Sequence, residues 1–173
     1  MFLSDLRIGI RFVVIAGILA HLLGISISKK CFDHSAFPFS DFEWERGGRF
    51  YNKLGVSRWM AKMPDMSKII PYMFQKKLDA NMRPEYVLKY INETCLAELI
   101  HWLLVFSSPV LFFIVGGACG VLFMFMYIIG NIPFIIIQRY NRPKLVRLYK
   151  RQSKRVAMED EEETADEGVD TLV

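Results

Sequence analysis

Three ionisable side chains stand where a polar stretch of the sequence becomes apolar: Glu93, Glu98 and His101. On a helix, Glu98 and His101 share one face because they are three residues apart, and Glu93 lies about 80° from His101 around the axis. Ionisable groups that enter hydrocarbon are costly unless they are paired, so they need a reason to be there. A histidine that a carboxylate orients is a general base able to activate a hydroxyl. We therefore take these three residues as candidate catalytic residues, with His101 as the base.

Two other interpretations of this trio remain open. The side chains could form a hydrogen-bonded cluster between packed helices, or they could form ion pairs with Arg46, Arg49 or Arg139. A metal site is not expected, because a Glu-x-x-His pair of the di-iron type requires a second such pair, and the sequence has none. The sequence also contains no glycine-rich phosphate loop, no Gly-x-Ser-x-Gly elbow, no zinc spacing and no His-x-x-x-x-Asp box. We therefore expect no bound cofactor.

A second candidate site is the charged and aromatic segment of residues 43–65, which lies between apolar regions. If residues 44–53 are helical, Arg46, Arg49 and Lys53 fall on one face by their three- and four-residue spacing. The two glycines between the arginines weaken a helix but give a ligand close access to the backbone. Such a basic face suits a phosphate, a carboxylate or an anionic lipid headgroup.

The alternative for this segment is a solvated helix that lies in the membrane interface. Trp44 and Trp59 would anchor it, because tryptophan favours the boundary between water and lipid. Glu45 lies four residues before Arg49 and can pair with it on such a helix.

Apolar segments must position these side chains. Hydrophobic residues make up 53% of the 173-residue chain, and they gather into runs long enough to cross a bilayer. The first run covers about residues 9–28. Residues 99–137 hold no formal charge, which is enough for two short spans at about 99–115 and 120–137 with a glycine-rich turn between them. We therefore predict an all-α integral membrane protein with three transmembrane helices, and one span plus a re-entrant hairpin is the alternative.

Residues 41–98 form the polar half of the protein and are predicted to build amphipathic helices on the cytoplasmic membrane surface. One helix is expected over residues 66–79, with an apolar face, a lysine-rich face and a kink at Pro71. Pro84 suits the first position of the next helix. That helix begins amphipathic and enters lipid at Leu99.

Charge is unevenly distributed along the chain. The net charge is only +4, but eight of the 18 acidic residues and none of the 22 basic ones lie in residues 159–173. We predict that this acidic tail is disordered and that residues 1–158 form one membrane-embedded helical domain. Eight basic residues in the juxtamembrane segment 138–155 place that end in the cytoplasm, together with residues 29–98. Because this charge borders membrane spans, it favours anionic lipid over nucleic acid as a partner.

Three blocks of the sequence resemble the signature of the glycosyl-4,4′-diaponeurosporenoate acyltransferase family, which consists of small bacterial membrane proteins. They are Trp44-Glu45-Arg46-Gly47-Gly48-Arg49-Phe50-Tyr51 with Leu54, Val56, Arg58-Trp59 and Pro64-Asp65; Glu93-Thr94 with Ala97-Glu98 and His101-Trp102; and Asn131-Ile132-Pro133 followed by Gln138-Arg139-Tyr140-Asn141-Arg142-Pro143. The blocks cover most of residues 43–147 in the family's order, and three linked blocks are far more specific than any one of them.

The resemblance implies a multi-pass enzyme of the cell membrane in carotenoid biosynthesis, which moves a fatty acyl group onto a sugar hydroxyl of a glycolipid. The acyl donor would be acyl-coenzyme A or acyl carrier protein. In this interpretation Glu98 or Glu93 orients His101, and Arg46, Arg49, Arg139 and Arg142 hold the donor's phosphates or stabilise the oxyanion. The full set of expected substrate-binding residues is Glu45, Arg46, Arg49, Tyr51, Arg58, Trp59, Arg139, Asn141 and Arg142.

A second class of function remains open. The protein could be a non-catalytic membrane subunit or an anionic-lipid-binding protein, with the charged segment as its docking surface. The sequence does not determine the acceptor lipid, the acyl length or the oligomeric state.

Overall fold

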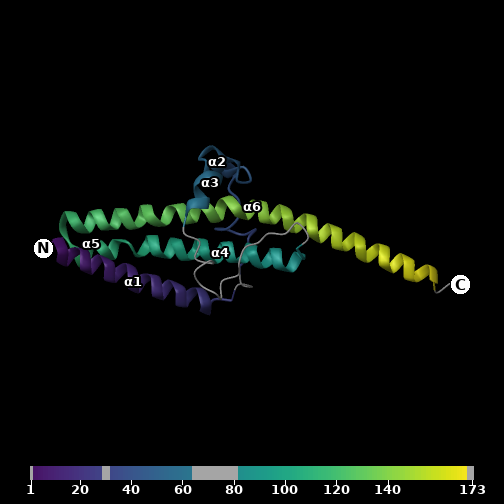
Figure 1. The fold of residues 1–173 in the computed structure, drawn as a ribbon, viewed down its shortest axis with the longest axis horizontal. Helices are drawn as coiled ribbons and strands as arrows, with labels where there is room; N and C mark the ends of the chain where they lie inside the picture. Colours follow the sequence, from purple (N-terminus) through teal and green to yellow (C-terminus); the bar gives the residue numbers. More distant parts are fainter. Residues whose placement is uncertain (1, 29–31, 64–81, 171–173) are drawn as a thin grey trace.

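The computed structural model describes residues 2–28, 32–63 and 82–170, and every regular element in these residues is a helix (Figure 1). Three elements are long: α1 (Phe2–Ser26), α4 (Pro84–Ser107) and α6 (Gly117–Asp170). The others are short: η2 (Glu43–Glu45), α2 (Arg49–Lys53), α3 (Val56–Trp59), η3 (Met60–Lys62) and α5 (Pro109–Val115).

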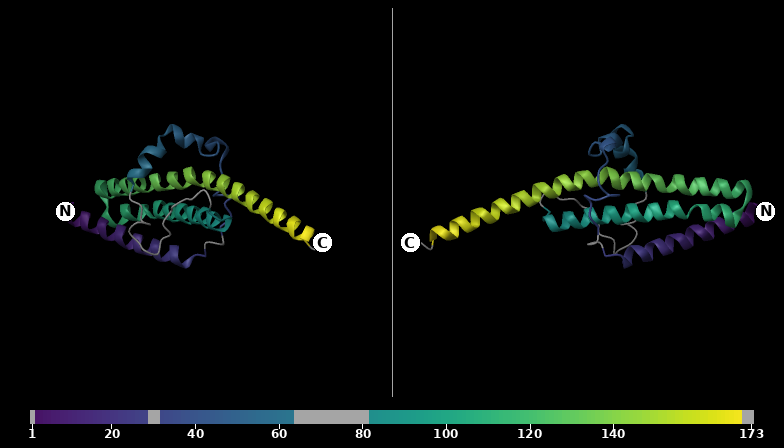
Figure 2. Two further views of the ribbon diagram at one scale, coloured as in Figure 1. Left: turned by 45° about the vertical axis from the view of Figure 1, so that its right-hand side comes forward. Right: turned by 180° about the vertical axis from the view of Figure 1, so that it is seen from behind.

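The long helices form an elongated bundle. α4 and α5, one after the other, form the first arm of a hairpin, and α6 runs back along them as the second arm. α1 lies along the hairpin, on the side of α4 away from α6 (Figures 1 and 2). Three stretches among the described residues are long and apolar enough to cross a membrane: Leu3–Ser26, Pro84–Val115 and Gly117–Glu161. The predicted all-α fold with three candidate membrane helices is therefore confirmed. Each arm of the hairpin exceeds the roughly 20 residues that a span requires, so length does not demand a re-entrant loop.

The short helices α2 and α3 sit on α6, on the face opposite α4 (Figure 1). Two small apolar clusters hold α6 between these neighbours. Tyr140 packs with Tyr51 and Val56 of the short helices, whereas Leu145 packs with Val87 and Ile91 of α4. Many other large apolar side chains of the long helices are exposed, as expected for surfaces that face lipid.

The segment after Glu43 is not one continuous helix over residues 44–53, which was the condition for Arg46, Arg49 and Lys53 to share a face. Three successive residues have positive φ: Arg46 at 51°, Gly47 at 67° and Gly48 at 85°. This left-handed run ends η2 and redirects the chain before α2 begins. Arg46 and Arg49 therefore do not share a helical face, and the condition is not met because glycine tolerates the left-handed region that a helix interior excludes.

The two glycines bring this loop onto α6. A Cβ atom on Gly48 would lie 3.3 Å from the backbone oxygen of Tyr140. The Gly47 N–H donates to a carboxylate oxygen of Asp41 at 2.6 Å, and its carbonyl accepts from Arg147 at 3.3 Å. The glycines were expected to give a ligand close access to the backbone. In the structure they let the loop pack closely against Tyr140 and Arg147 of α6.

Other sequence expectations have different outcomes. Pro84 is the first residue of α4, as predicted. The helix expected over residues 66–79 lies outside the described residues. α6 continues as helix through Asp170, where the sequence predicted a disordered tail from Glu159. Five glutamates and one alanine in residues 159–170 favour a helix. Arg155 also pairs with Glu159 one turn later at 3.3 Å.

The hairpin turn at Gly116 is where the sequence placed it, in the glycine-rich stretch of residues 116–120. Gly116 and Gly117 have φ values of 76° and 56°. A Cβ atom on Gly120 would lie only 3.0 Å from the backbone oxygen of Phe112, so the arms approach most closely at this glycine. The absence of a side chain at position 120 therefore lets the hairpin close.

Gly120→Leu should open the hairpin and destabilise the protein. Overpacking of this kind costs about 1–3 kcal/mol, because the neighbouring atom belongs to backbone that cannot rotate away. Gly130→Leu is the matched control on the same helix, since a Cβ there meets nothing within 4 Å. Thermal unfolding in detergent should show a lower melting temperature for the first variant only. Equal melting temperatures for the two variants would contradict this packing.

Candidate functional site

Arg139 of α6 is the centre of a buried charged network that joins three parts of the chain. Its Nε and Nη2 atoms donate to both carboxylate oxygens of Glu45, at 2.5 and 2.7 Å. Its Nη1 atom donates to Glu98 of α4 at 2.8 Å. The remaining donors reach the carbonyl oxygens of Pro38 and Ser40, each at 3.0 Å. All five guanidinium N–H groups therefore have protein acceptors.

Arg142 completes the network one helical turn further along α6. It donates to the second carboxylate oxygen of Glu98 at 2.5 Å, to the hydroxyl and carbonyl oxygens of Thr94 at 3.0 and 3.1 Å, and to the carbonyl of Phe39 at 2.7 Å. Glu98 thus bridges the two arginines, and it is 1% exposed. Two carboxylates and two guanidinium groups cancel in charge, which is the condition under which such groups tolerate burial.

Glu45 is equally buried, at 1% exposure, and it also accepts hydrogen bonds from Tyr51 and from the Phe42 N–H. Burial alone would raise the pKa of Glu45, but the hydrogen bonds from Arg139, Tyr51 and Phe42 outweigh it and hold the pKa below its ordinary value. Burial and the neighbouring carboxylate raise the pKa of Tyr51, so its phenol keeps its proton. Phe42 also covers the Arg139 guanidinium, 4.3 Å from the ring centroid.

His101 lies beside this network and has a different partner. Its Nδ1 atom is 2.9 Å from Oδ1 of Asn131, and its ring stacks on Phe134 with a centroid distance of 4.7 Å. The sequence predicted that Glu98 or Glu93 orients this ring. Glu98 is instead directed to the arginines and, at 3.4 Å, to the Trp102 indole N–H. For Glu98 the expectation is corrected, because the arginines offer the carboxylate a full charge and the imidazole does not, whereas the orienting role of Glu93 stays a prediction.

The second bond of Asn131 fixes the tautomer of His101. The amide nitrogen of Asn131 donates to the carbonyl of Tyr127 at 2.9 Å, so its oxygen is the atom that faces the ring. An acceptor at Nδ1 means that Nδ1 carries the proton and Nε2 carries the lone pair. His101 therefore has one nitrogen held in place and the other in its basic form.

The predicted site residues other than His101 divide into three groups: buried, exposed and half-buried. Glu45, Tyr51, Glu98, Arg139 and Arg142 meet in the buried network. Arg46, Arg49 and Arg58 are exposed on the short helices and the loop before them. Trp59 is half-buried and donates its indole N–H to the Leu54 carbonyl at 3.2 Å. Glu93 and Asn141 are half-buried outside the network.

Sequence reasoning missed the roles of Asn131 and Thr94. Both lie in the blocks that carried the family resemblance, and an amide in an otherwise apolar helix is itself a signal of a polar contact. The three carbonyl oxygens of residues 38–40 carry no sequence signal at all. Among the described residues, no three His, Cys, Asp or Glu side chains are placed to hold a metal ion.

Comparison with known proteins identifies the family of the chain. The profile of the family described as glycosyl-4,4′-diaponeurosporenoate acyltransferase matches residues 30–151. The chain belongs to this family. The enzymes of that name from Staphylococcus aureus strains MRSA252 and N315 are 35% and 34% identical over 138 residues, which cover 77% of this chain and 82% of each relative. No solved structure matches the chain. As a member of this bacterial family, the protein is an acyltransferase.

Arg139→Ala should destabilise this acyltransferase strongly, because it leaves two carboxylates buried without their cation. Breaking a buried ion pair in this way costs about 3–5 kcal/mol. Arg155→Ala is the control, since its pair with Glu159 is exposed and such a pair is worth about 0–1 kcal/mol. Thermal unfolding in detergent measures both. Similar losses in the two variants would contradict the organising role of Arg139.

The lowered pKa of Glu45 predicts acid sensitivity. A group whose pKa is lower in the folded state stabilises the fold above its unfolded pKa of about 4.3, and this contribution disappears as the pH falls through the folded value. The melting temperature of the wild type should therefore fall more steeply than that of Glu45→Gln when the pH is lowered below about 4.5. Parallel curves for the two proteins would rule out a Glu45 contribution.

Proposed function

We propose that this enzyme transfers a fatty acyl group to a sugar hydroxyl of a glycosylated carotenoid, as the name of its relatives indicates for them. The observation that carries the proposal is the identity of 35% across 82% of the staphylococcal enzyme. The matched range includes the buried network and the His101–Asn131 pair. The acceptor of this chain is therefore expected to be glycosyl-4,4′-diaponeurosporenoate or a closely related glycolipid.

His101 is the proposed general base. Its Nε2 atom takes the proton of the sugar hydroxyl while the hydroxyl oxygen forms a bond to the carbonyl carbon of the acyl thioester. Collapse of the tetrahedral intermediate breaks the C–S bond, and the imidazolium returns the proton to the leaving thiolate. Asn131 supports this assignment because its oxygen contacts Nδ1, which leaves Nε2, on the side of the ring away from Asn131, as the basic nitrogen. Direct attack needs no nucleophile from the protein.

The network next to His101 suggests different roles for the arginines. Arg139 donates all five N–H groups to protein acceptors, so we assign it and Arg142 to positioning the loop of residues 38–45. The exposed Arg46, Arg49 and Arg58 have guanidinium groups at the surface and are the better candidates for phosphate groups of the donor. The donor is proposed to be acyl-coenzyme A or acyl carrier protein.

The proposed orientation puts the short helices and the end of α6 in the cytoplasm. Eight basic residues of segment 138–155 favour that side, and both donors are cytoplasmic. α1 and the hairpin turn then place the N-terminus at the opposite membrane surface (Figure 1).

A non-catalytic lipid-binding role is the second candidate. The observation that favours it is the set of exposed arginines beside exposed Trp44 and Phe50, which would suit an anionic membrane surface. In that case the imidazole would only join two helices.

Mass spectrometry of membrane lipids with and without this protein tests the proposal, in cells that supply the glycosylated carotenoid. An acylated product should appear only with the wild type. His101→Ala should reduce its formation by about 10²–10⁴-fold, the usual contribution of a general base. His21→Ala is the control, because His21 is exposed on α1. Absence of product with the wild type would overturn acyl transfer, and normal activity of His101→Ala would overturn the assigned base.

A further inference from the structure

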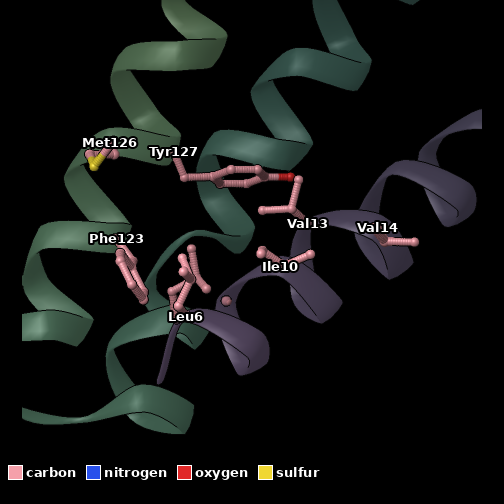
Figure 3. Close-up of a pocket in the computed structure, with 9 residues that line it drawn as sticks. Leu6, Ile10, Val13, Val14, Phe123, Met126 and Tyr127 are labelled. Atoms are coloured by element: carbon pink, nitrogen blue, oxygen red, sulfur yellow. The ribbon is translucent and has the colours of Figure 1, made fainter. Parts of the chain in front are cut away.

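An apolar cavity of about 350 Å³ lies between α1 and the hairpin, near the Gly116 turn (Figure 3). Ile10 and Val13 of α1 line one side, and Phe123 and Tyr127 of α6 line the other. Leu111 of α5, which is 1% exposed, also lines it. The lining is almost entirely carbon. The volume of the cavity is at the small end of the range for ligand pockets, which is about 300–1,000 Å³.

The way α1 packs leaves this space open. α1 touches α6 closely at Gly9, where a Cβ atom would lie 3.0 Å from the ring of Phe123. Beyond that contact, Ile10 and Val13 are 54% and 45% exposed, so no helix among the described residues fills the gap beside them. The Tyr127 ring reaches from α6 toward α1 (Figure 3) and meets Phe12 edge-on at 5.7 Å. The aromatic rings of Phe123 and Tyr127 therefore bound the cavity, which is open between α1 and α6.

The cavity is in line with the candidate site along α6. Tyr127 is four residues from Asn131, or about 6 Å along the axis, and its carbonyl accepts the hydrogen bond that orients Asn131 toward His101. Arg139 follows eight residues after Asn131, about 12 Å further. The apolar cavity, the contact of Asn131 with the His101 imidazole of α4, and the charged network thus follow one another along the axis of α6.

We propose that this cavity binds the hydrocarbon chain of the acyl donor and sets the length of the chain that the enzyme transfers. The inference rests on the proposed acyl transfer. An acyl thioester has the same order of parts: an apolar chain, the reacting carbonyl, and the carrier with its anionic groups. The cavity volume suits a single hydrocarbon chain rather than a whole glycolipid. The lining is almost entirely carbon, and the Tyr127 hydroxyl is its one side-chain group that could bind a polar part of a ligand.

Two substitutions of opposite sign test the proposal. Val13→Trp fills the cavity and should shift the preferred donor to shorter chains. Phe123→Ala enlarges it and should shift the preference to longer ones. Each methylene gained or lost from the cavity should change the ratio of long-chain to short-chain transfer by about fourfold. Ile15→Trp and Phe125→Ala are the matched controls, because both residues are exposed on the same two helices and neither lines the cavity.

The assay uses the full-length protein in membranes with acyl-coenzyme A donors of several lengths, and mass spectrometry reads the product. Opposite shifts of the preferred chain length in Val13→Trp and Phe123→Ala, with unchanged length profiles in the controls, would support the proposal. A folding defect would not shift the preferred length in opposite directions. Unchanged length profiles in active cavity variants would overturn it. A changed KM for the acceptor with an unchanged length profile would overturn it too, since the cavity would then hold the acceptor. Absence of transfer by the wild type would instead overturn the proposed function itself.

Discussion

The burial of Arg139 between Glu45 and Glu98 is the constraint on which the rest of the structure depends. A guanidinium group inside a membrane bundle is tolerated only where every donor has an acceptor and its charge is compensated. Glu45 comes from the loop, Glu98 comes from α4, and the carbonyl oxygens come from residues 38–40. The Arg139 side chain of α6 therefore holds both the loop and α4 in place. If either moved away, Arg139 would lose the carboxylate that compensates its buried charge.

This constraint separates positioning from chemistry. Arg139 and Arg142, which the family resemblance suggested as ligands for phosphate, are committed to the protein itself, whereas Arg46, Arg49 and Arg58 are exposed. His101 stands between the network and the apolar cavity, held through Asn131 by a neutral hydrogen bond. Because this partner is a neutral amide, it does not stabilise the imidazolium form as a carboxylate would.

The loop that carries Glu45 shows how local strain serves this arrangement. Left-handed backbone at residues 46–48 is unfavourable for Arg46 and available to the two glycines. The turn presses the loop against the backbone of Tyr140 and directs the Glu45 side chain inward. The apolar packing of Tyr51 and Val56 on Tyr140 then holds it there. In a regular helix, Arg46 and Arg49 of this loop would lie along one face.

The sequence by itself determined the helical class, the three apolar helices and the glycine turn, because these follow from local composition and spacing. The family followed from the resemblance of three linked motifs. The cost of a charge next to hydrocarbon also singled out Glu98 of the charged network, whereas Glu45, Arg139 and Arg142 became candidate site residues through the family resemblance. Only the tertiary structure decided the pairs. Glu45 could reach Arg49 along a helix, but Arg139, 94 residues away, offers it a bidentate contact away from water. Which partner a buried carboxylate takes depends on the distances that packing creates, and no spacing in the chain records them.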